Sequence, residues 1–382
     1  MPAKGAHVDV IAGGGIVGLS IAWRLARSGR PVTVADPAPA SGASHAAAGM
    51  LAPVSEVTYT EAPLLRLGLA ALRRWPSFAA ELAVDAGLAG ADALDFRTDG
   101  TLDVAFGADD LAALDELAAF MEKLELPVER LTGRECRRLE PMLAPAVRGG
   151  LLAPGDAWVD PRRVTAALLT ALDRLGVPLV RARVSELLRD DGTVTGVRLT
   201  PPDVQAPGVA DGGVLRAERV ILAAGAWSAA LAGVPVRPVK GQIMRLRSSQ
   251  PLLGRCVRGT VHGSSVYLVP RGDGELVVGA TQEELGFDTR VTAGGLYELL
   301  RDARELVPGV TELEVSDVVA GLRPGTPDNL PVIGPSGTPG LTLATGHHRG
   351  GVLLAPLTTV ILLGEEGELA ALCSPERFRD IS

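Results

Sequence analysis

The sequence predicts a two-domain protein of mixed α/β class, in which a parallel-sheet domain is interleaved with an antiparallel-sheet domain. Three observations predict this arrangement. A strand, a helix and a second strand follow one another within residues 1–36, and such a unit begins a parallel sheet. Helices and strands alternate again near the end of the chain, whereas the middle is rich in strand-like runs. The length of 382 residues also suits two domains.

The composition is that of a globular protein. Apolar residues make up 47% and charged residues 21%, far from a disordered composition. The net charge of −8 argues against a nucleic-acid partner, because phosphate binding needs clustered Lys and Arg. Three widely spaced cysteines match no metal or disulfide pattern, so we expect no metal site. We see no signal peptide or membrane-spanning segment, and therefore expect a cytoplasmic protein with no membrane partner.

The first helix follows a phosphate-binding pattern. Residues 8–12 are predicted to form a buried strand, residues 16–28 a helix and residues 31–35 a second strand. Between the first two lies Gly13-Gly14-Gly15-Ile16-Val17-Gly18, whose glycines allow a tight turn, close approach of a pyrophosphate and packing of the helix. Asp36, after the second strand, can accept hydrogen bonds from a ribose. These features predict a dinucleotide site, although they do not separate FAD from NAD.

Three further segments consist of small residues, whose backbone can lie against a flat ligand. The first covers residues 41–50, where Ser44 can hydrogen-bond a phosphate or a hydroxyl group. The second, Ala223-Ala224-Gly225-Ala226-Trp227, ends a predicted buried strand over residues 214–223. The third, residues 345–352, is rich in glycine and opens a helix. The positive end of that helix could stabilise negative charge on a reduced cofactor.

The remaining elements are expected from periodicity and turn signals. We expect helices near residues 62–86, 109–124, 160–176, 294–306 and 350–363. Strands are expected near residues 177–183, 236–247, 266–270, 275–279, 315–322 and 341–344. Hairpins are expected at Asp99-Gly100 and at Asp191-Gly192, since such pairs favour tight turns. Residues 41–53 and 201–213 are expected to be loops.

In this order, these segments resemble the D-amino acid oxidase superfamily of flavoproteins. Residues 44–50, Ser-His-Ala-Ala-Ala-Gly-Met, look most like its glycine oxidase branch, which belongs to the thiamine pathway. The runs Tyr267-Leu268-Val269-Pro270-Arg271, Gly321-Leu322-Arg323-Pro324-Gly325-Thr326 and Pro331-Val332-Ile333-Gly334 add to the resemblance, which spans residues 8–356. It implies an FAD-binding Rossmann-like domain over residues 1–85, 150–230 and 325–382. An interleaved antiparallel-sheet domain for the substrate would take residues 86–149 and 231–324.

The resemblance also implies roles for single residues. Arg323 would bind the substrate carboxylate in a bidentate pair, Tyr267 would add its hydroxyl, and Met50 and Arg349 would complete the pocket. The residues implied to contact FAD are Gly13, Gly15, Ile16, Val17, Gly18, Asp36, Ser44, Ala47, Gly49, Met50, Val184 (just after a predicted strand), Ala224, Gly225, Trp227, His347, Arg349, Gly350, Gly351 and Val352. No catalytic residue beyond FAD is implied. Related sarcosine oxidases bind flavin through a cysteine just before the Arg-Pro-Gly-Thr run; this chain has none there, which implies non-covalent FAD.

The implied function is oxidation of glycine, with sarcosine and small D-amino acids as further candidates. The products would be glyoxylate or another 2-oxo acid, ammonia and hydrogen peroxide, with molecular oxygen as acceptor and a homo-oligomer as the implied assembly. The alternatives on the same fold are a sarcosine or D-amino acid oxidase and a quinone-linked D-amino acid dehydrogenase. A flavoprotein without enzymatic activity is a third. The family more often has an aromatic residue at His348 and Asn at Gly350, so the flavin-side wall of the pocket is expected to differ.

Overall fold

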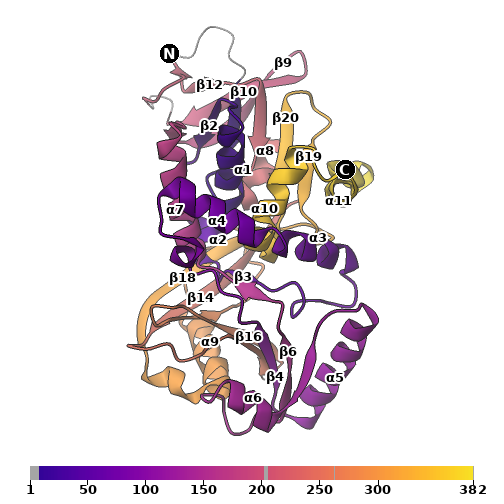
Figure 1. The fold of residues 1–382 in the computed structure, drawn as a ribbon. Helices are drawn as coiled ribbons and strands as arrows, with labels where there is room; N and C mark the ends of the chain where they lie inside the picture. The colour runs from indigo at the N-terminus through magenta and orange to yellow at the C-terminus, as the bar shows by residue number, and fades with distance from the viewer. Residues whose placement is uncertain (1–7, 202–204, 262, 382) are drawn as a thin grey trace.

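Two large sheets organise the chain into two halves (Figure 1). The computed structural model describes residues 8–201, 205–261 and 263–381. Residues 1–7, 202–204 and 382, which the predicted domains and the predicted 201–213 loop include, lie outside the described residues. The upper half in Figure 1 contains a six-stranded sheet, and the lower half an eight-stranded sheet.

The six-stranded sheet has the order β19-β20-β13-β1-β2-β8. Its strands are β1 (Asp9–Ala12), β2 (Val32–Ala35), β8 (Leu179–Val180), β13 (Arg219–Leu222), β19 (Val332–Pro335) and β20 (Leu341–Thr345). All neighbouring pairs are parallel except β19 with β20. Parallel strands need crossover connections, which the helical segments supply.

Each face of this sheet is covered by a different layer. Ile11 packs with α1 (Ile16–Arg27), α4 (Trp75–Ala86), α7 (Pro161–Arg174) and α10 (Gly351–Leu362) in one core cluster. Val10, its neighbour, faces the opposite way into a cluster with a four-stranded antiparallel sheet. The strands of that small sheet are β9 (Arg183–Asp190), β10 (Thr193–Thr200), β11 (Val209–Ala210) and β12 (Val214–Arg216). Burial on both faces explains the continuous apolar run of β1.

The eight-stranded sheet has the order β18-β14-β17-β16-β15-β4-β6-β5 and is antiparallel except where β4 meets β15. Its strands are β4 (Thr101–Ala105), β5 (Glu129–Thr132), β6 (Gly149–Ala153), β14 (Arg237–Arg247), β15 (Cys256–Val261), β16 (Ser264–Pro270), β17 (Glu275–Gly279) and β18 (Glu314–Gly325). Helices α6 (Gly133–Leu139) and α9 (Ala293–Leu306) pack with its apolar side chains. The predicted domain boundaries stay a prediction; the one between residues 149 and 150 falls inside β6.

The remaining helices and strands complete the fold of the described residues. They comprise α2 (Gly42–Ala46), α3 (Ala62–Leu72), α5 (Ala108–Lys123), α8 (Ser228–Ala232), α11 (Gly367–Cys373), and the strand pair β3 (Met50–Leu51) and β7 (Ala157–Trp158). The 3-10 turns are η1 (Ala91–Leu94), η2 (Gly225–Trp227), η3 (Pro308–Glu312), η4 (His348–Gly350) and η5 (Pro375–Ile381). No helix among the described residues is long and apolar enough to span a bilayer.

Most predicted elements are confirmed within a few residues, including the hairpin at Asp191-Gly192, but several predictions are wrong. The hairpin at Asp99-Gly100 does not form, because β4 pairs with β6 and β15, while Arg97 bridges to Trp158 instead. The long helical region predicted over residues 62–86 is confirmed and divides into two helices, α3 (Ala62–Leu72) and α4. Pro76 lies in the first turn of α4, and proline cannot donate a backbone hydrogen bond to a preceding turn.

Three segments of small or mixed residues also differ from expectation. The loop predicted over residues 41–53 contains the short helix α2 and the strand β3. The strand predicted over residues 214–223 splits into β12 and β13, which belong to different sheets. The strand predicted over residues 177–183 is reduced to β8, and Val184 lies inside β9 rather than after a strand.

Candidate active site

A cavity of about 1100 Å³ lies between the two large sheets. Its wall combines the β1–α1 turn, the segment after β2, residues 41–50, the start of β9, the end of β13, and strands β14, β16 and β18. These elements are distant in the sequence, and the carboxyl ends of parallel strands are where ligands bind in α/β sheets. The cavity is therefore the candidate site.

The turn between β1 and α1 has no room for side chains at two positions. Gly13 has φ +119°, and a Cβ there would lie 2.3 Å from the Ala223 carbonyl oxygen. A Cβ at Gly18 would lie 2.0 Å from the Gly13 carbonyl oxygen. At Gly15, by contrast, a Cβ would meet only Ser44 Oγ, at 3.2 Å. The turn therefore packs tightly against β13 and exposes its backbone to the cavity.

Two side chains already contact the backbone N–H groups of this turn. Asp36 Oδ2 accepts a hydrogen bond from the Gly14 N–H at 2.7 Å, and Ser44 Oγ accepts one from the Ile16 N–H at 2.9 Å. Ile16 is the first residue of α1, whose free N–H groups and dipole favour an anion. An elongated diphosphate compound fits this chemistry, since the turn offers N–H donors and Asp36 offers acceptors beside them.

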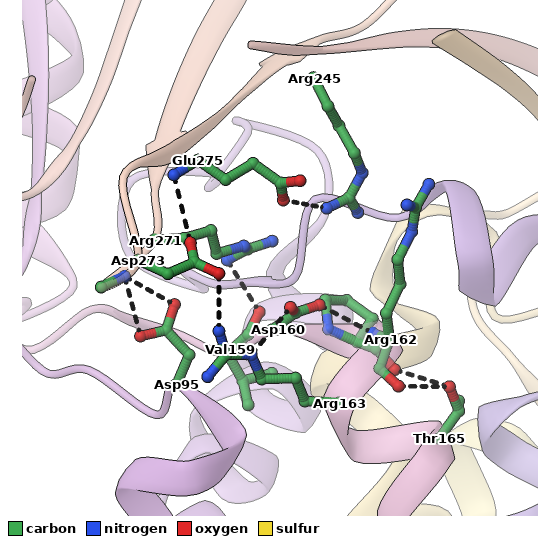
Figure 2. Close-up of polar contacts among 12 residues, drawn as sticks. Asp95, Val159, Asp160, Arg162, Arg163, Thr165, Arg245, Arg271, Asp273 and Glu275 are labelled. Carbon is green, nitrogen blue, oxygen red and sulfur yellow. Dashed lines mark hydrogen bonds and ion pairs between the residues drawn. The ribbon is translucent and has the colours of Figure 1, made fainter. Parts of the chain in front are cut away.

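Ala47 and Ala48 are contacted by two buried arginines, Arg245 and Arg271, which Figure 2 shows beside Glu275 and Val159. The buried Arg271 donates from Nη1 to the Val159 carbonyl at 3.1 Å and from Nη2 to the Ala48 carbonyl. Arg245, also buried, pairs with Glu275 and reaches the Ala47 carbonyl at 3.5 Å. Sequence reasoning quoted Arg271 only as part of a motif and missed Arg245. Neither arginine has a local signal, since Arg271 follows the end of β16 and β14 around Arg245 is buried without alternation.

The far end of the cavity contains Arg323 and Tyr267, each lying over a glycine. A Cβ at Gly241 would lie 2.3 Å from Arg323 Nη1, and a Cβ at Gly279 would lie 2.4 Å from the Tyr267 hydroxyl. Arg323 donates from Nη1 to the Thr281 carbonyl at 3.2 Å, and it forms no ion pair within residues 8–201, 205–261 and 263–381. The structure thus brings together the two residues predicted to bind a carboxylate and leaves the cation unneutralised.

Arg349 lines the same cavity but already has a carboxylate partner. Its Nη2 pairs with Glu61 Oε2, and Asn329 donates to the other oxygen of Glu61 at 2.7 Å. The Arg349 and Asn329 donors offset the effect of burial and lower the pKa of Glu61. Arg349 is therefore less available to a substrate than Arg323 is.

The two neighbouring histidines are neutral at pH 7. Burial lowers the pKa of His347 to about 4, and its Nε2 shares a hydrogen bond of 2.9 Å with the Thr358 hydroxyl. Burial, followed by the charge of Arg349, lowers the pKa of His348 to about 4. His348 has φ +46°, an uncommon conformation for a residue other than glycine. Among the described residues no group of His, Cys, Asp and Glu could hold a metal ion.

Most predicted site residues line the cavity. These are Gly13, Gly15, Ile16, Val17, Asp36, Ser44, Ala47, Gly49, Met50, Val184, Ala224, Gly225, Trp227, Tyr267, Arg323, His347, Arg349, Gly351 and Val352. Gly18 and Gly350 do not: Gly18 packs α1 against the turn, and a Cβ at Gly350 would face Leu354 at 3.2 Å. Sequence reasoning missed Glu56 and Arg258, which line the substrate end.

Comparisons with known proteins agree with this architecture. The family model described as FAD dependent oxidoreductase matches residues 10–362. A bifunctional protein ThiO/ThiG from Nostoc sp. is 34% identical over 92% of this chain and 51% of its own length, so the chain spans about half of that relative. The glycine oxidase of Geobacillus kaustophilus is 34% identical over 92% of this chain and 90% of its own. The crystal structure of glycine oxidase from that organism covers 94% of both chains with a TM-score of 0.83 and 33% identity. The predicted fold and superfamily are confirmed.

Proposed function

We propose that this chain, which belongs to the family of FAD-dependent oxidoreductases, is an oxidase of a small α-amino acid, with glycine as the first candidate substrate. The observation that carries the proposal is the pairing of Arg323 with Tyr267 at the end of the cavity. Arg323 is unpaired by any carboxylate within the described residues, and it offers the planar donor pair that a carboxylate prefers. The similarity to the glycine oxidase of Geobacillus kaustophilus supports the same choice.

FAD would extend along the cavity from β2 to β18. The turn at Gly13 and Gly15 and the start of α1 would bind its diphosphate, while Asp36 would exchange its contact with Gly14 for a ribose hydroxyl. The α10 end that begins at Gly351 would face the flavin. The remaining cofactor contacts are proposed for the cavity-lining residues predicted from the sequence. All three cysteines are buried and none lines the cavity, which supports non-covalent FAD.

The protein's part in the reaction is to bind and orient the substrate. When bound, FAD supplies the acceptor for a hydride from the α-carbon and passes the electrons to molecular oxygen. Arg323 would fix the carboxylate and Tyr267 would donate its hydroxyl to the same group, so that the α C–H faces the cofactor. His347 and His348, neutral at pH 7, do not add positive charge beside the substrate's amino group. The product imine would hydrolyse to glyoxylate and ammonia.

The first experiment is a visible spectrum of the purified protein before and after anaerobic addition of glycine. Loss of the flavin bands with glycine is the expected result. Flavin bands that glycine leaves unchanged, while sarcosine or D-alanine removes them, would move the substrate to those amines. No reduction by any of the three would contradict the proposed function. Hydrogen peroxide release in air then distinguishes an oxidase from a quinone-linked dehydrogenase.

A cytoplasmic location and a homo-oligomeric assembly also stay proposals. The resemblance to the oxidase family is their support. Sedimentation of the FAD-loaded protein tests the assembly, and a mass equal to that of one chain would contradict it.

A further inference from the structure

Glu56 places a negative charge at the substrate end of the cavity. It belongs to the connection between β3 and α3, lines the cavity, and its side chain is 25% exposed. Its carboxylate accepts no hydrogen bond from residues 8–201, 205–261 or 263–381, and its one cationic neighbour among them is Arg258, whose Nη1 lies 3.7 Å from Oε1. A carboxylate that faces a cavity with unfilled acceptor positions is suited to an N–H donor from a ligand.

The segment that carries Glu56 is fixed from two sides. Arg258 Nη1 donates to the Ser55 carbonyl at 2.9 Å. The buried Asp156 accepts hydrogen bonds from the backbone N–H groups of Val54 at 3.2 Å and Ser55 at 3.0 Å. Both contacts hold the two residues that precede Glu56, so the backbone that carries its side chain is positioned without a bound ligand. A preorganised group of this kind binds without a large ordering cost.

Glu56 and Arg323 act on the same hydroxyl group. Burial raises the pKa of Tyr267, the Arg323 guanidinium lowers it, and the Glu56 carboxylate raises it again. The register of the sheet places Arg258 directly beside Tyr267 on the neighbouring strand. The hydroxyl therefore lies within electrostatic range of two cations, Arg323 and Arg258, and of the Glu56 carboxylate, with which Arg258 is paired. This combination of charges is complementary to an amino acid zwitterion, whose carboxylate and ammonium groups are joined by one carbon.

We propose that Glu56 binds the amino group of the substrate and selects ligands with an N–H-bearing amine over carboxylates that lack one. This inference rests on the proposed function and deepens it. Arg323 and Tyr267 would take the carboxylate, and Glu56 would accept hydrogen bonds from the ammonium group. By favouring the charged amine, Glu56 also retains the proton that must leave before hydride transfer.

The test compares Glu56→Gln with wild type as FAD-loaded proteins. Acetate binding is measured from the shift of the flavin absorbance, and glycine affinity and limiting reduction rate are measured by anaerobic rapid mixing. We expect the Kd for glycine to rise about tenfold or more, because a charge-assisted hydrogen bond is lost. The Kd for acetate should change by less than about twofold. The pH at which the reduction rate reaches half its maximum should fall, since a neutral amide no longer stabilises the ammonium.

Three results separate this inference from the function beneath it. If none of glycine, sarcosine and D-alanine reduces the wild-type flavin, the proposed function fails and this inference fails with it. If glycine reduces both proteins with equal affinity, or if acetate and glycine weaken by the same factor, Glu56 does not bind the amine and the inference alone is overturned. Glu81→Gln, in a surface pair with Arg24, is the matched control and should behave as wild type.

A measurement on unmodified protein covers a variant that fails to load FAD. Glycolate has a hydroxyl group where glycine has its ammonium, and it should bind to wild type at least tenfold more weakly than glycine does. Equal affinity for the two ligands overturns the inference, because the carboxylate would then account for all the selectivity.

Discussion

The two ends of the cavity are built by different means. The end at Gly13 and Ser44 is formed by backbone groups and small side chains that are close in the sequence. The end at Arg323, Tyr267 and Glu56 is formed by charged and polar side chains from separate strands and one connection. The first end depends on the absence of side chains and the second on their charge. Substitutions at the first end should therefore reduce stability and flavin binding, whereas substitutions at the second end should reduce substrate binding.

The largest effect is expected for Gly13→Val. The valine would have to adopt φ +119° with its Cβ 2.3 Å from the Ala223 carbonyl oxygen, so the β1–α1 turn must move. We expect a loss of about 4 kcal/mol or more in the free energy of unfolding and no bound flavin. Urea denaturation and the flavin content measure both. Gly155→Ala, at a glycine with nothing within 4 Å of the added Cβ, is the control and should stay within about 0.5 kcal/mol.

Arg323→Ala should leave FAD binding unchanged and weaken substrate binding. Loss of one partner of a buried charge pair costs about 2–5 kcal/mol, which corresponds to a fall in kcat/KM of roughly 30-fold to several thousandfold. Flavin content should stay at the wild-type level. Arg66→Ala removes an arginine that is 53% exposed and should leave the kinetics unchanged. Wild-type kinetics in the Arg323 variant would contradict its assignment to the carboxylate.

The pH dependence of stability tests the carboxyl group that fixes the Glu56 segment. Burial raises the pKa of Asp156 from 3.8 to about 6, against the effect of its hydrogen bonds. Because the folded state holds the proton more tightly, this group's stabilisation is complete below about pH 4 and is lost as the pH rises through 6. The loss is up to about 3 kcal/mol. Urea titrations from pH 4 to 7 should show a flatter profile for Asp156→Asn, and an unchanged slope would refute the assignment.

The smallest loss of stability is expected for substitution of Arg271, which contacts the backbone near the Gly13 and Ser44 end of the cavity. Arg271→Met would leave the Ala48 and Val159 carbonyls without their donor, at about 1–3 kcal/mol for an unsatisfied buried group. Arg163→Met, which breaks a partly exposed pair with Asp273, should cost less than about 1 kcal/mol. Thermal melts of both variants measure the difference. Equal losses of stability in the two variants would mean that the Arg271 contacts with the Ala48 and Val159 carbonyls do not stabilise residues 44–50.

This difference between the ends also decides what the sequence could predict. The GxGxxG run, Asp36 and residues 44–50 are local patterns, because a tight turn and close backbone approach require particular small residues in order. Arg323 and Tyr267 came from resemblance, since nothing local distinguishes an arginine in a Pro-Gly run from a solvated one. Glu56 was not predicted, because its position depends on Asp156, a residue about 100 positions away that holds its segment.

The errors in the predicted fold also arise from contacts between residues that are distant in the sequence. Asp99-Gly100 is a sound hairpin signal, but β6 and β15 outcompete the local partner for β4. Residues 214–223 have strand propensity throughout, yet the segment is divided between β12 in the four-stranded sheet and β13 in the six-stranded sheet. Long-range pairing overrides local preference in both cases, whereas the β1–α1–β2 unit is local and was predicted within one residue or so of its observed bounds.

The position of β20 sets the order in which a ribosome can complete this protein. β20 lies between β13 and β19 in the six-stranded sheet, although its residues 341–345 follow those of the other five strands in the sequence. The sheet therefore lacks an internal strand, and the cavity lacks residues 347–352, until those residues have emerged from the ribosome. Flavin loading should consequently follow the synthesis of residues 341–352, and nascent chains stalled before residue 341 should emerge without cofactor.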